Sequence, residues 1–163
     1  MIATKSITVY ILLPMNSGAS YANWTVTDPE SFLQKAKDNL SIAEEAKNHG
    51  KFDIEANRIY FALHQLACEL VRLSKMAVTR TGKNATPNRP YKIDHGSYHQ
   101  EISKLIGYNA DIVYTQWAIL RNMADYNHEL ISSSQMWLKT INRKRNDAFK
   151  VAEEIYGKLR AIP

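Results

Sequence analysis

Residues 53–73 read Asp-Ile-Glu-Ala-Asn-Arg-Ile-Tyr-Phe-Ala-Leu-His-Gln-Leu-Ala-Cys-Glu-Leu-Val-Arg-Leu. Apolar residues recur in this stretch at three- and four-residue steps, a pattern typical of an α-helix with one buried stripe. Five of them form a continuous seam: Ile59, Leu63, Leu66, Leu70 and Leu73. We expect Asp53 to cap this helix, and we expect the helix to form the centre of the core.

Helical patterns also lie on either side of this stretch. Residues 28–30 (Asp-Pro-Glu) supply an N-cap acceptor, a proline at the first helical position and an early acid, so one helix is predicted to begin there. It is expected to end at residues 48–50 (Asn-His-Gly), with the glycine past the helix end. A short helix with a capping box at Ser97 and Gln100 follows, and two more begin near residues 109–111 and 132–134.

The last helix is predicted to place apolar side chains inward and a group of cations outward. The inward residues are Met136, Ile141, Ala148, Val151, Ile155 and Leu159. The outward residues are Lys139, Arg143, Lys144, Arg145 and Lys150. A run of charges on one helix is usually a solvated face, although these cations would also suit an anionic ligand.

Together these patterns predict an all-α fold, a mostly antiparallel bundle of four long helices and one short one. The helical domain covers residues 28–163 and follows an irregular N-terminal extension over residues 1–27. A length of 163 residues, 45% hydrophobic and 23% charged, suits one globular domain with a single core. The single cysteine, Cys68, excludes a disulfide framework within the chain and is expected to be buried.

Several classes of function are disfavoured by the sequence. It contains no glycine-rich phosphate loop, no Gly-x-Ser-x-Gly elbow and no Cys-x-x-Cys pair. The apolar run at residues 7–15 is interrupted by Pro14 and lacks a convincing cleavage site, so we reject a signal peptide. The run is also well short of the roughly 18 apolar residues that span a membrane. A cytoplasmic protein with no membrane partner is therefore expected, and its net charge of +5 is compatible with an anionic partner.

Candidate catalytic residues lie at 120–128, Leu-Arg-Asn-Met-Ala-Asp-Tyr-Asn-His, the polar end of an apolar helical segment. If that helix continues unbroken, Arg121 and His128 share one face, because they are seven residues apart. A guanidinium can hold phosphate oxygens in bidentate fashion, and an imidazole changes protonation near neutral pH. This pair is therefore suited to chemistry at a phosphodiester. The alternative is a surface ion pair between Arg121 and Asp125, with His128 at the helix end.

Two stretches of the chain resemble the HEPN superfamily. Arg121, the polar Asn122 and His128 are similar to that family's pattern of Arg, a polar residue and His, here with a spacer of six residues, the upper limit of the pattern. Residues 57–67 resemble the Asn-Arg-x-Tyr-Tyr-Ala-x-x-His-x-Ala helix of small stand-alone members, with Phe61 at the second tyrosine and with the histidine, His64, one position earlier. The Ala-Asp-Tyr at residues 124–126 resembles the same subgroup, and the likeness covers about residues 28–160.

The resemblance implies a metal-independent endoribonuclease without a cofactor, the toxin of a toxin–antitoxin or defence system. The 2′-hydroxyl of the RNA would attack the adjacent phosphate and leave a 2′,3′-cyclic phosphate and a 5′-hydroxyl. His128 would transfer protons and Arg121 would stabilise phosphoryl charge, while Asn122 would orient one of the two. Asp125 and Tyr126 would support this pair. A two-fold homodimer would bring both Arg/His pairs into one cleft.

The resemblance also leaves a non-catalytic alternative open. Many relatives with the Ala-Asp-Tyr variant lack the histidine, and several pair with a minimal nucleotidyltransferase encoded beside them. The chain departs from the Arg-x4-His-x-Tyr pattern of toxins that such a nucleotidyltransferase modifies, because Leu130 stands two residues after His128. In this alternative the chain is a helical binding module for a nucleotidyltransferase-type antitoxin. The retained histidine favours the nuclease.

Three further features have two interpretations each. His64 and Tyr60 share a helical face, and a half-buried hydrogen-bonded pair is favoured over a catalytic role. His95 and His99 have a spacing that zinc sites use, but no third ligand is near in sequence, so no metal site is predicted.

Residues 79–92 lack helical periodicity and form a basic loop, which is either an RNA-backbone contact or a solvated surface. Its cations are Arg80, Lys83, Arg89 and Lys92.

Overall fold

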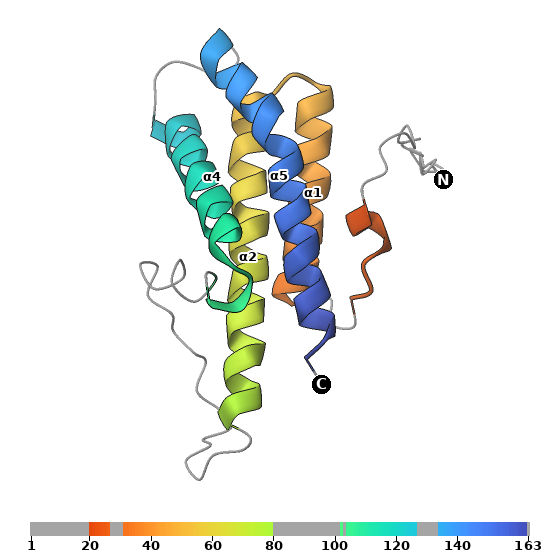
Figure 1. The fold of residues 1–163 in the computed structure, drawn as a ribbon. Helices are drawn as coiled ribbons and strands as arrows, with labels where there is room; N and C mark the ends of the chain where they lie inside the picture. Colours follow the sequence, from red (N-terminus) through yellow and green to blue (C-terminus); the bar gives the residue numbers. More distant parts are fainter. Residues whose placement is uncertain (1–19, 27–30, 80–101, 103, 127–133, 163) are drawn as a thin grey trace, which may run out of the picture.

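Four long helices pack together in the computed structural model, which describes residues 20–26, 31–79, 102, 104–126 and 134–162 (Figure 1). They are α1 (Phe32–Asn48), α2 (Phe52–Thr79), α4 (Tyr108–Tyr126) and α5 (Gln135–Arg160), preceded by the 3-10 turn η1 (Ser20–Asn23). Figure 1 shows α1 and α4 running in one direction and α2 and α5 in the other. The described residues contain no strand, so the predicted all-α bundle is confirmed. No described helix is long and apolar enough to cross a membrane.

The central position of α2 follows from its apolar seam. This helix packs against α1, α4 and α5, and four of the five predicted seam residues are buried, with Leu73 half-buried. The seam meets side chains such as Trp117 of α4 and Ile155 of α5, which are also buried. Fully burying one large apolar side chain stabilises a fold by about 1.5–3 kcal/mol. The predicted role of this helix as the centre of the core is confirmed.

The starts of three helices differ slightly from the predicted ones. α1 begins at Phe32 rather than at residues 28–30, because Ser31 is the N-cap and its hydroxyl accepts the Gln34 N–H at 3.1 Å. Asp53 lies within the first turn of α2 instead of capping it. Residues 109–111 likewise fall inside the first turn of α4. At α1 a second suitable cap, Ser31, replaces the predicted one, whereas α2 and α4 begin directly after Lys51 and Gly107 and so include the predicted caps in their first turns.

Two glycines with positive φ mark helix boundaries. Gly50 follows the end of α1, as predicted, at a φ of +68°, a left-handed conformation that costs glycine little. Gly107 has a φ of +116° and precedes α4. Ile102 is buried just before it, with Leu105 partly buried against the core. The predicted capping box at residues 97–100 lies outside the described residues.

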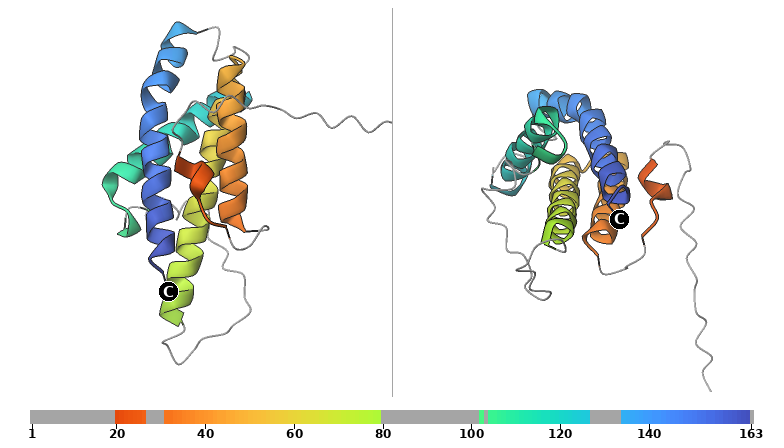
Figure 2. Two further views of the ribbon diagram at one scale, coloured as in Figure 1. Left: turned by 90° about the vertical axis from the view of Figure 1, so that its right-hand side faces the viewer. Right: turned by 60° about the horizontal axis from the view of Figure 1, so that its bottom comes forward.

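Residues 20–26, which we assigned to an irregular extension, pack on the bundle beside α1 and α5 (Figure 2). Trp24 is buried and stacks on Tyr156 of α5, with ring centroids 4.6 Å apart, and its Nε1 donates to Glu153 at 3.0 Å. Tyr21 is buried as well and donates its hydroxyl to Glu44 of α1. Burial, then this hydrogen bond and the nearby negative charge, raise the pKa of the Tyr21 hydroxyl well above its ordinary value.

Two residues of α5 lie on the opposite side from the predicted one. Met136 is exposed, whereas it was predicted to face the core. Arg145 turns inward and forms a two-pronged ion pair with Glu55 of α2, whose side chain is only 1% exposed. Its Nη2 donates to Oε2 of Glu55 at 2.8 Å. Buried carboxylates require such a partner, so Arg145 belongs to the core and only the other four cations line the outer face.

Arg145→Met should lower the free energy of unfolding by about 3–5 kcal/mol, because it leaves a buried carboxylate without its cation. Arg143→Met is the matched control on the exposed side of the same helix, and it should change stability by no more than about 0.5 kcal/mol. Urea denaturation of the two variants measures both effects. Equal losses in both variants would show that Glu55 does not depend on Arg145.

Candidate functional site

Arg121 lies near the C-terminal end of α4, where this helix packs against α2. Its guanidinium carbon is 5.8 Å from the ring centroid of Tyr60, 5.7 Å from that of Phe61 and 5.7 Å from that of Tyr126. Aromatic faces attract a cation within about 6 Å, so all three rings contribute to holding the guanidinium. Two of the rings come from α2 and one from the last turn of α4.

Polar partners hold the same guanidinium from its own helix. The Nε atom is 2.6 Å from Oδ2 of Asp125, one turn further along α4. The Nε–H does not point along this contact and has no aligned hydrogen bond, so the attraction is Coulombic. The Nη1 atom donates to the side-chain oxygen of Asn122 at 3.1 Å. The ion pair that we considered as an alternative role for Arg121 is therefore present.

Asp125 also connects α4 to α2. Its second oxygen, Oδ1, accepts a hydrogen bond from Nδ2 of Asn57 at 2.8 Å. Asn57 lies one turn before Tyr60 and Phe61, whose rings contact Arg121. The two stretches that carry the family resemblance, residues 57–61 and 121–126, therefore meet at one surface although they are distant in sequence.

The site is partly accessible to solvent. The side chains of Arg121 and Asp125 are each 26% exposed, and Tyr126 is 78% exposed. Asn122 is exposed beside them. Solvent screens an ion pair of this kind, whose usual contribution to stability is about 0–1 kcal/mol. The contacts therefore orient the guanidinium without being a major source of stability.

A polar cluster continues from this surface into the bundle. The ring of Tyr60 stacks on that of His64, with ring centroids 5.9 Å apart. The hydrogen-bond partner of the His64 imidazole is a different tyrosine, because its Nδ1 lies 2.8 Å from the hydroxyl of Tyr114. The Tyr60 and Tyr114 hydroxyls are 3.4 Å apart. On the other side of the imidazole, Nε2 is 3.6 Å from the sulfur of Cys68, which is buried as predicted.

Tyr114 is the member of this cluster that was not predicted from the sequence. It stands seven residues before Arg121 on α4, a spacing that places both on one face of the helix. That spacing was the available signal, although a tyrosine within an apolar helical stripe usually indicates packing alone. The predicted pairing of His64 with Tyr60 is a ring contact, and the hydrogen bond goes to Tyr114.

Other predicted site residues fall outside the described parts of the chain. These are His128, His95, His99 and the four cations of the basic loop, Arg80, Lys83, Arg89 and Lys92. The shared face of Arg121 and His128 therefore stays a prediction, since the described part of α4 ends at Tyr126. Within the described residues, no three His, Cys, Asp or Glu side chains are grouped so that they could hold a metal ion.

Comparisons of the chain with protein-family models, with curated proteins and with solved structures each gave no match. Any function must therefore be inferred from the residues of this chain and their geometry. Within that geometry the guanidinium of Arg121 is a candidate anion-binding group, because it is oriented by several contacts and remains partly exposed.

Asp125→Asn should lower the free energy of unfolding by less than about 1 kcal/mol, because a partly exposed ion pair contributes little. The asparagine keeps an oxygen that can accept from Asn57. Asp147→Asn is the matched control, since Asp147 is an exposed partner of Lys144 on α5 at 3.8 Å. Thermal denaturation measures both. A loss above about 2 kcal/mol at position 125 alone would make Arg121 a structural residue.

Proposed function

We propose that the chain is a metal-independent endoribonuclease of the HEPN type, acting as the toxin of a toxin–antitoxin or defence system. The observation that carries the proposal is the meeting of residues 57–61 with residues 121–126 around one guanidinium. Each stretch resembles the family separately, and neither resemblance required the two to be neighbours in space. RNA is the proposed substrate, and no cofactor is needed.

In the proposed reaction the 2′-hydroxyl oxygen forms a bond to the neighbouring phosphorus while the bond to the 5′-oxygen breaks. His128 takes the proton of the 2′-hydroxyl, and a second acid returns a proton to the leaving 5′-oxygen. We assign that second role to His128 of another copy in a two-fold dimer, since such an interface places both pairs symmetrically. The products are a 2′,3′-cyclic phosphate and a 5′-hydroxyl.

Arg121 stabilises the negative charge that grows on the phosphoryl oxygens. Asp125 and Asn122 occupy the Nε and Nη1 atoms, whereas Nη2 has no hydrogen-bond partner within the described part of the chain. A phosphate would be repelled by the Asp125 carboxylate beside Nε, so it must approach the end of the guanidinium that points away from Nε. We therefore assign the Nη2 hydrogen at that end to the phosphate. A preoriented donor of this kind stabilises a transition state without rearranging during the reaction.

The second candidate function is a non-catalytic helical module that binds a nucleotidyltransferase-type antitoxin. Its support is the exposed apolar surface of α4, where Ile119 and Tyr126 are both exposed and lie seven residues apart on one face. Exposed apolar side chains that are grouped on one face often belong to protein interfaces. This function needs neither Arg121 nor His128 for chemistry, so activity measurements separate it from the nuclease.

The purified protein should cleave single-stranded RNA in excess EDTA and leave cyclic phosphate ends. Arg121→Ala and His128→Ala should each reduce the rate at least about a hundredfold, because each removes a group that acts in the transition state. Gel assays and mass spectrometry of the products measure rate and end chemistry. Circular dichroism and light scattering should show unchanged helicity and an unchanged dimer.

His95→Ala and His99→Ala are the matched controls and should cleave at the normal rate. No cleavage by the unmodified protein, alone or freed from a bound partner, would favour the non-catalytic module. Cleavage that survives both the Arg121 and the His128 substitutions would assign the activity to another site.

A further inference from the structure

A groove lies about three turns further along α2 than Tyr60, where four parts of the chain converge: residues 25–26, the start of α1, the second half of α2 and the end of α5. It has a volume of about 290 Å³. The first turn of α1, the second half of α2 and the end of α5 each supply one apolar wall, Leu33, Leu73 and Leu159 respectively. This volume is close to the lower end of the range of about 300–1,000 Å³ that is common for small-molecule sites. The groove therefore suits a small organic molecule rather than a polymer.

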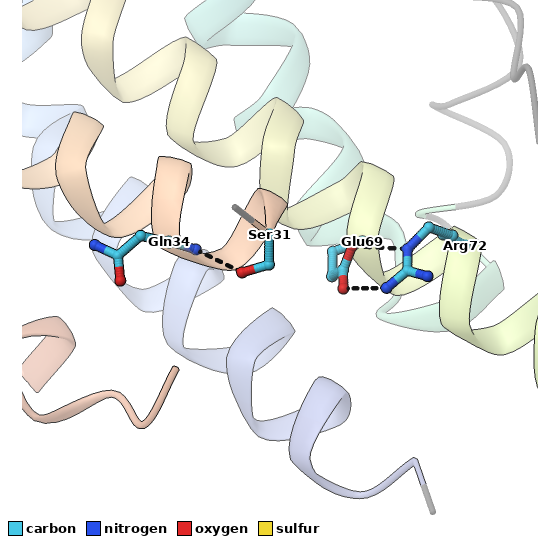
Figure 3. Close-up of polar contacts among 4 residues, drawn as sticks. All are labelled: Ser31, Gln34, Glu69 and Arg72. Carbon is cyan, nitrogen blue, oxygen red and sulfur yellow. Dashed lines mark hydrogen bonds and ion pairs between the residues drawn. The ribbon is translucent and has the colours of Figure 1, made fainter. Parts of the chain in front are cut away.

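A buried carboxylate lies in the groove wall and is already neutralised. Glu69 is buried, and both of its oxygens accept hydrogen bonds from Arg72 of the same helix (Figure 3). The Nε–Oε2 distance is 3.0 Å and the Nη2–Oε1 distance is 2.6 Å. Figure 3 also shows the N-cap residue Ser31, another lining residue, with its hydroxyl turned to Gln34 of α1. Because the Glu69–Arg72 pair has no net charge, it neither attracts nor repels an ion strongly.

Arg160 gives the groove its net positive charge. It is exposed at the end of α5, and its guanidinium carbon is 6.0 Å from the ring centroid of Tyr156, which also lines the groove. Arg160 has no ion pair with any other described residue. The lining thus consists of apolar walls, the hydroxyl-bearing residues Thr25, Ser31 and Tyr156, one neutral ion pair and one cation whose charge is not balanced within the described chain.

We propose that this groove binds a small amphipathic carboxylate. The carboxylate would accept two parallel hydrogen bonds from the Arg160 guanidinium, a geometry that matches its planar fork. Its apolar body would cover Leu33, Leu73 and Leu159. A single guanidinium with no ion pair among the described residues neutralises one negative charge, which favours a carboxylate over a doubly charged phosphate. The site is separate from Arg121 and does not depend on the proposed nuclease activity.

Octanoate is the probe, and isothermal titration calorimetry with the full chain is the measurement. The unmodified protein should bind octanoate at one site, whereas 1-octanol and acetate should bind at least tenfold more weakly, because each lacks one half of the recognition. Arg160→Gln should weaken octanoate binding at least tenfold. Arg160→Lys should retain part of the affinity, since it keeps the charge but loses the fork.

Arg143→Gln is the matched control, because it removes the same charge from an exposed position nearer the other end of α5 and should leave binding within twofold of normal. Circular dichroism should show that all variants stay folded. Absence of saturable octanoate binding would overturn the proposal. Equal binding of 1-octanol would also overturn it, because the carboxylate would then have no role in recognition. Equal weakening of octanoate binding by Arg143→Gln and Arg160→Gln would overturn it as well, because the effect would then depend only on net charge.

Discussion

Burial of the apolar seam of α2 against three helices determines where the other elements lie. α1 is joined to α2 by the tight turn at Gly50, and α4 and α5 cover the remaining apolar surface of α2. Because α2 is buried along most of its described length, its polar side chains must find partners from neighbouring helices. Glu55 meets Arg145 of α5, and Asn57 meets Asp125 of α4. The partly exposed Arg121 site on α4 therefore rests against the same helix that organises the core.

Local periodicity was enough to predict the bundle, because apolar residues at three- and four-residue steps form a continuous stripe only on a helix. The seam of α2 and the stop at Gly50 are in the structure as predicted. Arg145 was predicted outward because charges in a helical pattern normally face water, and its carboxylate partner is 90 positions away. The burial of Trp24 was not predicted for a related reason. Its segment has no helical periodicity, and the Trp24 side chain is buried by packing on Tyr156 of α5.

The candidate site shows the same division between local and long-range information. The spacing of Arg121 and Asp125 on one helix indicated their ion pair as one of two interpretations, whereas no local pattern predicted that Asn57 would bind the other oxygen of Asp125. The rings around Arg121 come from both α2 and α4, so they are near it only because the two helices pack together. A guanidinium fixed in this way has already lost much of its conformational entropy, which lowers the entropic cost of binding an anion.

The proposed mechanism depends most on Arg121 as the group that binds the RNA phosphate. The direct measurement is the side-chain Nη2–H signal of Arg121 in ¹⁵N NMR spectra, during titration with an RNA whose nucleophilic 2′-hydroxyl is replaced by hydrogen. We predict a saturable shift of this signal with the same Kd as the overall binding, and little change in the signal of the exposed Arg143 on α5. RNA that binds while the Arg121 signal stays in place would contradict the mechanism.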